Sequence, residues 1–138
     1  MKNNNLSVSL LAIDILNKDL KFFLKILKKN DIKFIELPIT KLFKNYEIDN
    51  KKLKDFKNTI KKYDIKVSSI QSIFHETNIN IFTSKKKIIL NHIKSIFRFT
   101  KLVNCKNIIF GSPKNRFVPN NLKKNIIEDK KNFFFSLV

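Results

Sequence analysis

Two polar residues that could do chemistry interrupt segments that are otherwise apolar. Glu36 lies in IKFIELP (residues 32–38), and Gln71 lies in IKVSSIQSIF (residues 65–74). A carboxylate at a strand end can bind a sugar hydroxyl or assist a proton transfer. A buried amide must be hydrogen-bonded, either to a substrate or to neighbouring strands. Glu36 could also anchor a loop by accepting backbone N–H groups, so a structural role stays open for both residues.

A second polar group follows the apolar segment KNIIFG, in the loop that begins SPKNR. Its members carry a hydroxyl, an amide and two cations: Ser112, Lys114, Asn115 and Arg116. The two cations could clamp a phosphate or a carboxylate. The alternative is a loop that only packs against its neighbours. Gly111, the single glycine of the chain, is expected to end the preceding strand at a sharp backbone turn.

The histidines and the cysteine limit what metal or nucleophilic chemistry is expected. His75 and Glu76 are adjacent in a loop, and His92 lies within a predicted helix. An oxygen–nitrogen metal site needs several such ligands together, so we expect no metal site in this chain and assign no catalytic residue. His75 is interpreted as a surface loop residue, with contact to a ligand as the alternative. His92 and Cys105 are interpreted as packed, buried residues.

The segments that must position these residues alternate between strands and helices. Apolar runs predict strands at residues 6–13, 32–38, 65–74 and 106–111. Apolar stripes at helical spacing predict helices at residues 18–29, 51–63, 85–103 and 121–135. Asn17 and Ser84 are the expected N-caps of the first and third helices. Such alternation implies parallel strands joined by right-handed crossovers, an α/β fold in one domain of 138 residues.

The alternation of strands and helices fits both an open doubly wound sheet and half of a barrel. Four sequence segments favour the barrel. They are LSVSLLAI (6–13), IKFIELPITKLF (32–43), KVSSIQSIFHETNINIF (66–82) and NCKNIIFGSPKNR (104–116). Their succession resembles the sugar-phosphate isomerase/epimerase family, the xylose-isomerase-like (β/α)8 barrels, with FGSPKNR as the most specific string. The resemblance implies four consecutive β/α units, half of a (β/α)8 TIM barrel. A complete barrel needs about 250 residues, so we expect a truncated N-terminal half.

The resemblance also implies an activity and a place for it. The site would lie at the carboxyl ends of the strands, and the reaction would be proton transfer next to the carbonyl of a sugar or sugar phosphate. A divalent metal would hold the sugar oxygens. On this basis the tentative substrate-binding residues are Glu36, Gln71, Ser112, Lys114 and Arg116, with His75 in a loop near the ligand.

The family's metal ligands come from strands five to eight, which these four units do not include. We therefore expect no cofactor in this chain and no metal-dependent activity from it alone. Completion of the barrel by a homodimer or by a separate second-half chain is one expectation. A half barrel without catalytic function that pairs with another chain is the alternative.

The net charge of +18 would, by itself, suggest a polyanionic partner. Only Arg98 and Arg116 are arginine, and the lysines are spread over nearly every predicted helix. Nucleic-acid readers favour arginine, so the composition disfavours nucleic acid. An abasic-site endonuclease-like relative of the same fold remains the alternative that would use this charge.

The cysteine content and the hydropathy predict where the protein resides. One cysteine cannot form an internal disulfide, which fits a reducing compartment. Asp14 and Lys18 interrupt the apolar run that a signal peptide would need. No stretch reaches the roughly 18 apolar residues of a membrane span. We expect a cytoplasmic protein.

Overall fold

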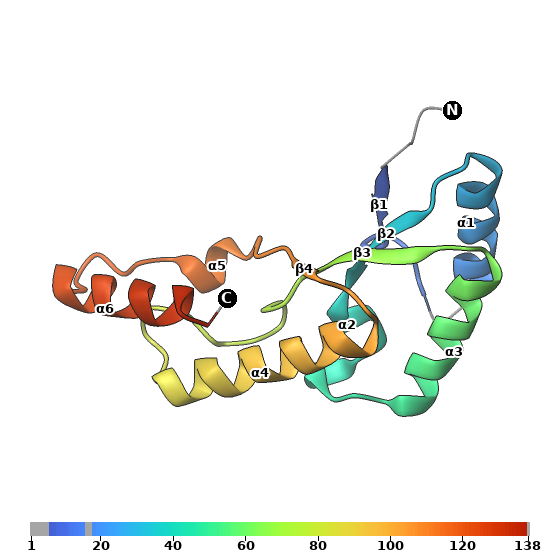
Figure 1. Ribbon diagram of the computed structural model, residues 1–138. Helices are drawn as coiled ribbons and strands as arrows, with labels where there is room; N and C mark the ends of the chain where they lie inside the picture. The colour runs from blue at the N-terminus through green and yellow to red at the C-terminus, as the bar shows by residue number, and fades with distance from the viewer. Residues whose placement is uncertain (1–5, 16–17, 138) are drawn as a thin grey trace.

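Four parallel strands lie side by side in the order in which they occur in the chain. The computed structural model describes residues 6–15 and 18–137 and has one sheet of order β1-β2-β3-β4 (Figure 1). The strands are β1 (Ser7–Ser9), β2 (Phe34–Pro38), β3 (Lys66–Gln71) and β4 (Asn107–Ile108). All three neighbouring pairs are parallel. This confirms the predicted α/β class and the parallel pairing.

One long helix follows each strand, as the sequence predicts. These helices are α1 (Lys18–Lys29), α3 (Asn50–Lys62), α4 (Lys86–Leu102) and α6 (Lys124–Phe135). Shorter elements occupy stretches that were predicted as loops: α2 (Ile39–Leu42), the 3-10 turn η1 (Lys44–Tyr46) and α5 (Pro113–Arg116). None of the helices in the described part of the chain is long and apolar enough to cross a membrane.

The core forms where apolar rows of the sheet meet the apolar stripes of the helices. Leu37 pairs with Ile70, and Ile70 pairs with Ile108. Leu37 and Ile70 are fully buried, in one cluster with the helix residues of the predicted stripes. The buried members of those stripes are Leu20, Leu24, Leu27, Leu53, Phe56, Ile60, Ile89, Ile93 and Ile96. Burial of these stripes is what fixes the helices against the strands.

Three helix-to-strand turns share one backbone geometry. Asp31, Asp64 and Asn104 follow α1, α3 and α4, and all three have a positive φ, between 53° and 58°. In each turn the next N–H donates to the carbonyl five positions back: Ile32 to Leu27, Ile65 to Ile60 and Cys105 to Thr100, at 2.9–3.1 Å. Glycine usually provides this helix end. Asp and Asn tolerate the left-handed region better than other residues, which is how a chain with one glycine makes these turns.

The strands are shorter than predicted because turns begin inside the apolar runs. Residues 6–13 form a strand only from Ser7 to Ser9, and the Ile13 N–H then donates to the Leu10 carbonyl and closes a turn. The strand predicted over residues 65–74 ends at Gln71, and Ser72 has a φ of 60°. Leu10, Ile73 and Phe74 in these turns are still buried, whereas Leu11 is exposed, so buried apolar residues extend beyond the sheet.

The fourth strand and its glycine also differ from the prediction. The predicted strand 106–111 is reduced to Asn107–Ile108, so it ends three residues before Gly111. The φ of Gly111 is not positive, and a Cβ at this position would have no neighbour within 4 Å. The prediction that Gly111 provides a sharp turn is therefore wrong.

The helix caps were only partly predictable. Ser84 is not the N-cap of α4: Lys85 holds that position, and Ser84 Oγ accepts the Asn80 N–H at 3.0 Å within the preceding loop. The expected cap Asn17 lies outside the described residues. Asp49 caps α3, accepting the Lys52 N–H at 3.0 Å. The fourth helix begins at Lys124, three residues after its predicted start.

Candidate functional site

A row of polar residues crosses the whole sheet. Its members are paired on adjacent strands. In order from β1 to β4 they are Ser9, Glu36, Ser69 and Asn107. Side chains alternate between the two faces along a strand, so residues paired across parallel strands share a face. Two hydroxyls, a carboxylate and an amide therefore line one strip of the sheet. We call these four residues the polar row.

Hydrogen bonds between β1 and β3 support the polar row. Ser7 Oγ lies 2.6 Å from Ser68 Oγ, and Ser68 Oγ donates to the Ile35 carbonyl at 3.1 Å. The Gln71 amide donates from Nε2 to Ser9 Oγ. The structure thus brings Gln71 to the polar row that contains Glu36. The partner of this amide is a side chain of β1, on the far side of β2, so Gln71 bonds within the sheet, which is one of the two alternatives that the sequence left open.

Ser69 is the most buried member of the polar row. Only 5% of its surface is exposed, and among the described residues its Oγ has no hydrogen-bond partner. A buried hydroxyl without a partner costs about 1–3 kcal/mol. Such a group indicates a place where a ligand or an ordered water can donate or accept. The signal in the sequence was a pair of serines within the apolar run KVSSIQ.

Tyr46 and His92 join the loops that follow β2 and β3. Tyr46 Oη donates to the His75 carbonyl at 2.6 Å and to the Ser72 carbonyl at 3.1 Å. His92 Nε2 donates to the Ile73 carbonyl at 2.5 Å, and its ring lies edge-on to Tyr46, with 4.6 Å between centroids. Burial, and secondarily the Glu76 carboxylate, raise the pKa of Tyr46 above its ordinary value. These contacts fix the backbone after β3 against the segment that follows β2.

The two histidines differ in their surroundings. His92 is half-buried between Tyr46 and Phe74, with 4.6 Å between its ring centroid and that of Phe74. This agrees with the prediction of a packed histidine. The side chain of His75 is exposed, and its Nε2 lies 3.8 Å from Glu76 Oε1. His75 thus contributes its backbone carbonyl to the Tyr46 contact.

Acid should weaken the fold through His92. Burial lowers the pKa of His92 in the folded chain, and the hydrogen bond to the Ile73 carbonyl opposes this only in part. An unfolded histidine titrates near 6.5. Below that pH the unfolded chain binds more protons, so the free energy of unfolding falls as the pH drops from about 6.5 toward the lowered folded pKa.

Urea unfolding measured between about pH 7.5 and pH 5.5 checks this expectation. His92→Gln should reduce the pH dependence in that window, because glutamine does not titrate. His75→Gln is the matched control and should leave the dependence in place, since the side chain of His75 is exposed. An unchanged pH dependence in His92→Gln would show that another group causes it.

The loop after β4 packs on the loop after β3. Asn115 Nδ2 donates to the Ile79 carbonyl at 2.6 Å and to Thr77 Oγ1 at 3.3 Å. The Ile81 N–H donates to the Asn115 carbonyl at 3.0 Å. Asn115 is 5% exposed. The most constrained residue of this loop is therefore the amide between the two cations.

The other predicted residues of that loop contribute backbone groups at most: the Lys114 carbonyl accepts Asn80 Nδ2 at 3.4 Å. Ser112 is half-buried, and its carbonyl accepts the Asn115 N–H at 3.1 Å. Lys114 and Arg116 are exposed, and the Arg116 guanidinium lies 5.4 Å from the centroid of the Phe110 ring. None of the contacts between described residues joins Lys114 or Arg116 to the polar row. The structure brings Glu36 and Gln71 together but does not bring the two cations to them.

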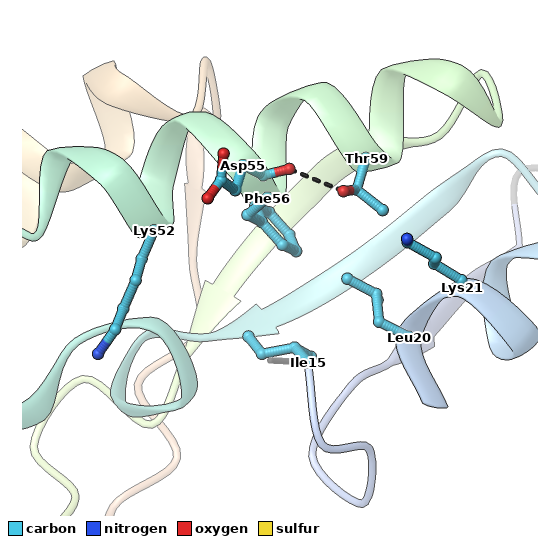
Figure 2. A pocket seen from close by; sticks show the side chains of 7 residues that line it. All are labelled: Ile15, Leu20, Lys21, Lys52, Asp55, Phe56 and Thr59. Atoms are coloured by element: carbon cyan, nitrogen blue, oxygen red, sulfur yellow. Dashed lines mark hydrogen bonds between the residues drawn. The ribbon is translucent and has the colours of Figure 1, made fainter. Parts of the chain in front are cut away.

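A cavity of about 310 Å³ lies elsewhere, between α1 and α3 (Figure 2). Figure 2 shows Phe56 pointing from α3 toward Ile15 and Leu20, which form an apolar floor. Lys21 and Lys52 lie at its margins, and Thr59 Oγ1 donates to the Asp55 carbonyl at 2.7 Å. None of the residues that the sequence singled out lines this cavity.

The donor set of the described residues does not fit a divalent metal. Within residues 6–15 and 18–137 no group of three or more His, Cys, Asp and Glu side chains could hold one. No family model and no curated protein matches the chain.

Proposed function

We propose that this chain is a sugar isomerase/epimerase-type β/α domain whose polar row binds the hydroxyl groups of a sugar. The observation that carries the proposal is the row itself, with the buried Ser69 hydroxyl at its centre and Glu36 and Asn107 as its neighbours. Serine hydroxyls donate and accept, the carboxylate accepts, and the amide does both. A polyol presents the complementary set of donors and acceptors.

The charge of the polar row favours a neutral sugar over a phosphate. Glu36 is its charged member, and a carboxylate repels a phosphate. Lys114 and Arg116, the expected phosphate clamp, lie in a loop fixed to residues 77–81 through Asn115. A sugar phosphate would therefore have to place its phosphate away from the row.

We propose that this chain binds a sugar, and we assign no residue to catalysis. In the barrels that the sequence resembles, residues of further strands bind a divalent metal. The described residues do not supply such a set of metal ligands. We propose that the four units form half of a barrel and that their part is to hold sugar oxygens. Glu36 and Ser69 are interior residues of β2 and β3, and Asn107 begins β4. The proposed binding surface is therefore a face of the sheet rather than the carboxyl ends of its strands, the usual place for ligands in α/β folds.

Amide NMR titrations with D-xylose, D-fructose and fructose phosphate test this function. Shifts should concentrate at Ser9, Glu36, Ser69 and Asn107, and the neutral sugars should bind more tightly than the phosphate. Glu36→Gln should weaken binding by roughly tenfold, because a hydrogen bond to a charged group contributes about 1.5–3 kcal/mol.

Glu47→Gln is the matched control, since Glu47 is exposed and outside the polar row. It should bind the sugars as the parent chain does. Equal weakening in both variants, or shifts confined to the cavity between α1 and α3, would contradict the proposal.

A further inference from the structure

An apolar groove lies at the β4 end of the sheet, where its lining residues Lys106 and Ile108 flank Asn107, the last member of the polar row. It has a volume of about 320 Å³ and is lined by Phe97, Lys106, Ile108, Phe110, Phe134 and Phe135. Figure 1 shows the elements that contribute these residues, with α6 lying over α4 beyond the end of β4. Lys86 Nζ of α4 and Asp129 Oδ1 of α6 are 2.8 Å apart, so an exposed ion pair joins the two helices.

The groove borders an open strand edge. Within the described sheet, β4 is an outer strand and pairs with β3 only. An outer strand presents N–H and C=O groups along its free side, and such an edge is a template for another strand. Ile109 follows β4 and is 39% exposed. The backbone here can accept an extended segment beside the apolar groove.

A chain of aromatic rings leads from the core into the groove. Ring centroids are 5.1 Å apart for Phe74 and Phe110, 5.1 Å for Phe110 and Phe134, and 6.2 Å for Phe134 and Phe135. Phe74 is fully buried, whereas Phe135 at the other end is 71% exposed. Rigid aromatic side chains of this kind are the usual anchors of a protein interface.

The margin of the groove is basic. Lys106 lines it, and Lys94 and Lys101 lie three residues before and four residues after Phe97 on α4, which places them on the same helix face. On α6, Lys131 pairs with Glu128 at 3.3 Å. A second copy also carries a net charge of +18 over its whole length, and like charges across an interface disfavour docking.

We propose that the groove docks an acidic protein segment, which adds an extended strand along β4 and places apolar side chains against Phe110 and Phe135. Carboxylates of the segment face Lys94, Lys101 and Lys106. Side chains of the segment alternate along it: apolar ones face the groove and acidic ones face the margin. This alternation has the two-residue period of a strand.

A short peptide of alternating valine and glutamate is the probe, and its binding to the full chain is measured by fluorescence anisotropy. Hydrogen exchange then locates it. Binding should slow amide exchange at Ile108 and Phe110, whereas the Ile109 N–H already donates to the Ile70 carbonyl at 2.8 Å. Binding should also weaken with added salt. Phe135→Ser should weaken binding by roughly tenfold, because an anchor side chain is lost. Phe117→Ser is the control, since Phe117 is equally exposed but lies outside the groove, and it should bind normally.

Several outcomes would overturn the proposal. One is equal weakening by Phe135→Ser and Phe117→Ser, and another is exchange protection away from β4. Equal binding of a valine–lysine peptide would remove the charge argument. Sedimentation of the chain alone should give a monomer, and a dimer that Phe135→Ser dissociates would assign the groove to a second copy. Because sugar binding is read at the polar row, failure here leaves the proposed function untouched.

Discussion

Replacing Phe99 with alanine should lower the free energy of unfolding by about 3–5 kcal/mol, the range for removal of a buried aromatic ring. Phe99 lies on α4 and is almost completely buried. Its ring meets that of Phe43 edge to face, with 4.9 Å between centroids. Phe43 directly follows α2, so the pair connects the segment after β2 with the helix after β3. The total free energy of unfolding of such a domain is about 5–15 kcal/mol, so this substitution would remove much of it.

Urea unfolding followed by circular dichroism measures this loss. Phe22→Ala is the matched control, because Phe22 is exposed on α1, and surface substitutions usually change stability by less than about 0.5 kcal/mol. A loss in Phe99→Ala no larger than in the control would contradict the packing described for α4.

Replacing Asn115 with alanine should lower the free energy of unfolding by about 1–3 kcal/mol, because it leaves the half-buried Ile79 carbonyl without this donor. The amide of Asn115 bonds the Ile79 carbonyl and Thr77 Oγ1, and alanine can do neither. The damage should be local to the contact between the loops after β3 and β4. Amide exchange at Ile81, whose N–H donates to the Asn115 carbonyl, should accelerate more than exchange in β2.

Thermal unfolding and amide exchange by NMR measure the two effects. Asn120→Ala is the control, since Asn120 is exposed in the segment that follows α5. It should leave both measurements unchanged. If Asn115→Ala matched that control, the Asn115 amide would not be what stabilises the contact between the two loops.

Helices were more predictable from the sequence than strands. The helix predicted over residues 18–29 has the same bounds in the structure, because its apolar stripe and the Asn30–Asp31 break are both local signals. Strands end where backbone turns begin, and Ser72 turns through a positive φ although the residues after it are apolar and buried. An apolar run in the sequence predicts that its residues are buried. It does not predict that they pair with another strand.

Some residues of the candidate site could be predicted from the sequence, and others could not. Glu36 and Gln71 could be singled out because a polar residue in an apolar strand is a local anomaly. The alignment of Ser9, Ser69 and Asn107 with Glu36 depends on the register of three strand pairs, which the sequence does not state. The contact between Asn115 and Ile79 spans 36 residues, so the packing of the loop after β4 was also beyond local reasoning.

The three left-handed turns at Asp31, Asp64 and Asn104 make each strand sensitive to insertions and deletions. In each unit the residue after the turn bonds back to the last helical turn, so the distance from helix to first strand residue is fixed. Strand side chains alternate with a period of two. One residue inserted beside Asp64 would therefore exchange the faces of β3, turning Ile70 toward the polar row and Gln71 into the core. Single-residue changes in chain length should thus be far less tolerated at these turns than in the segment after α5.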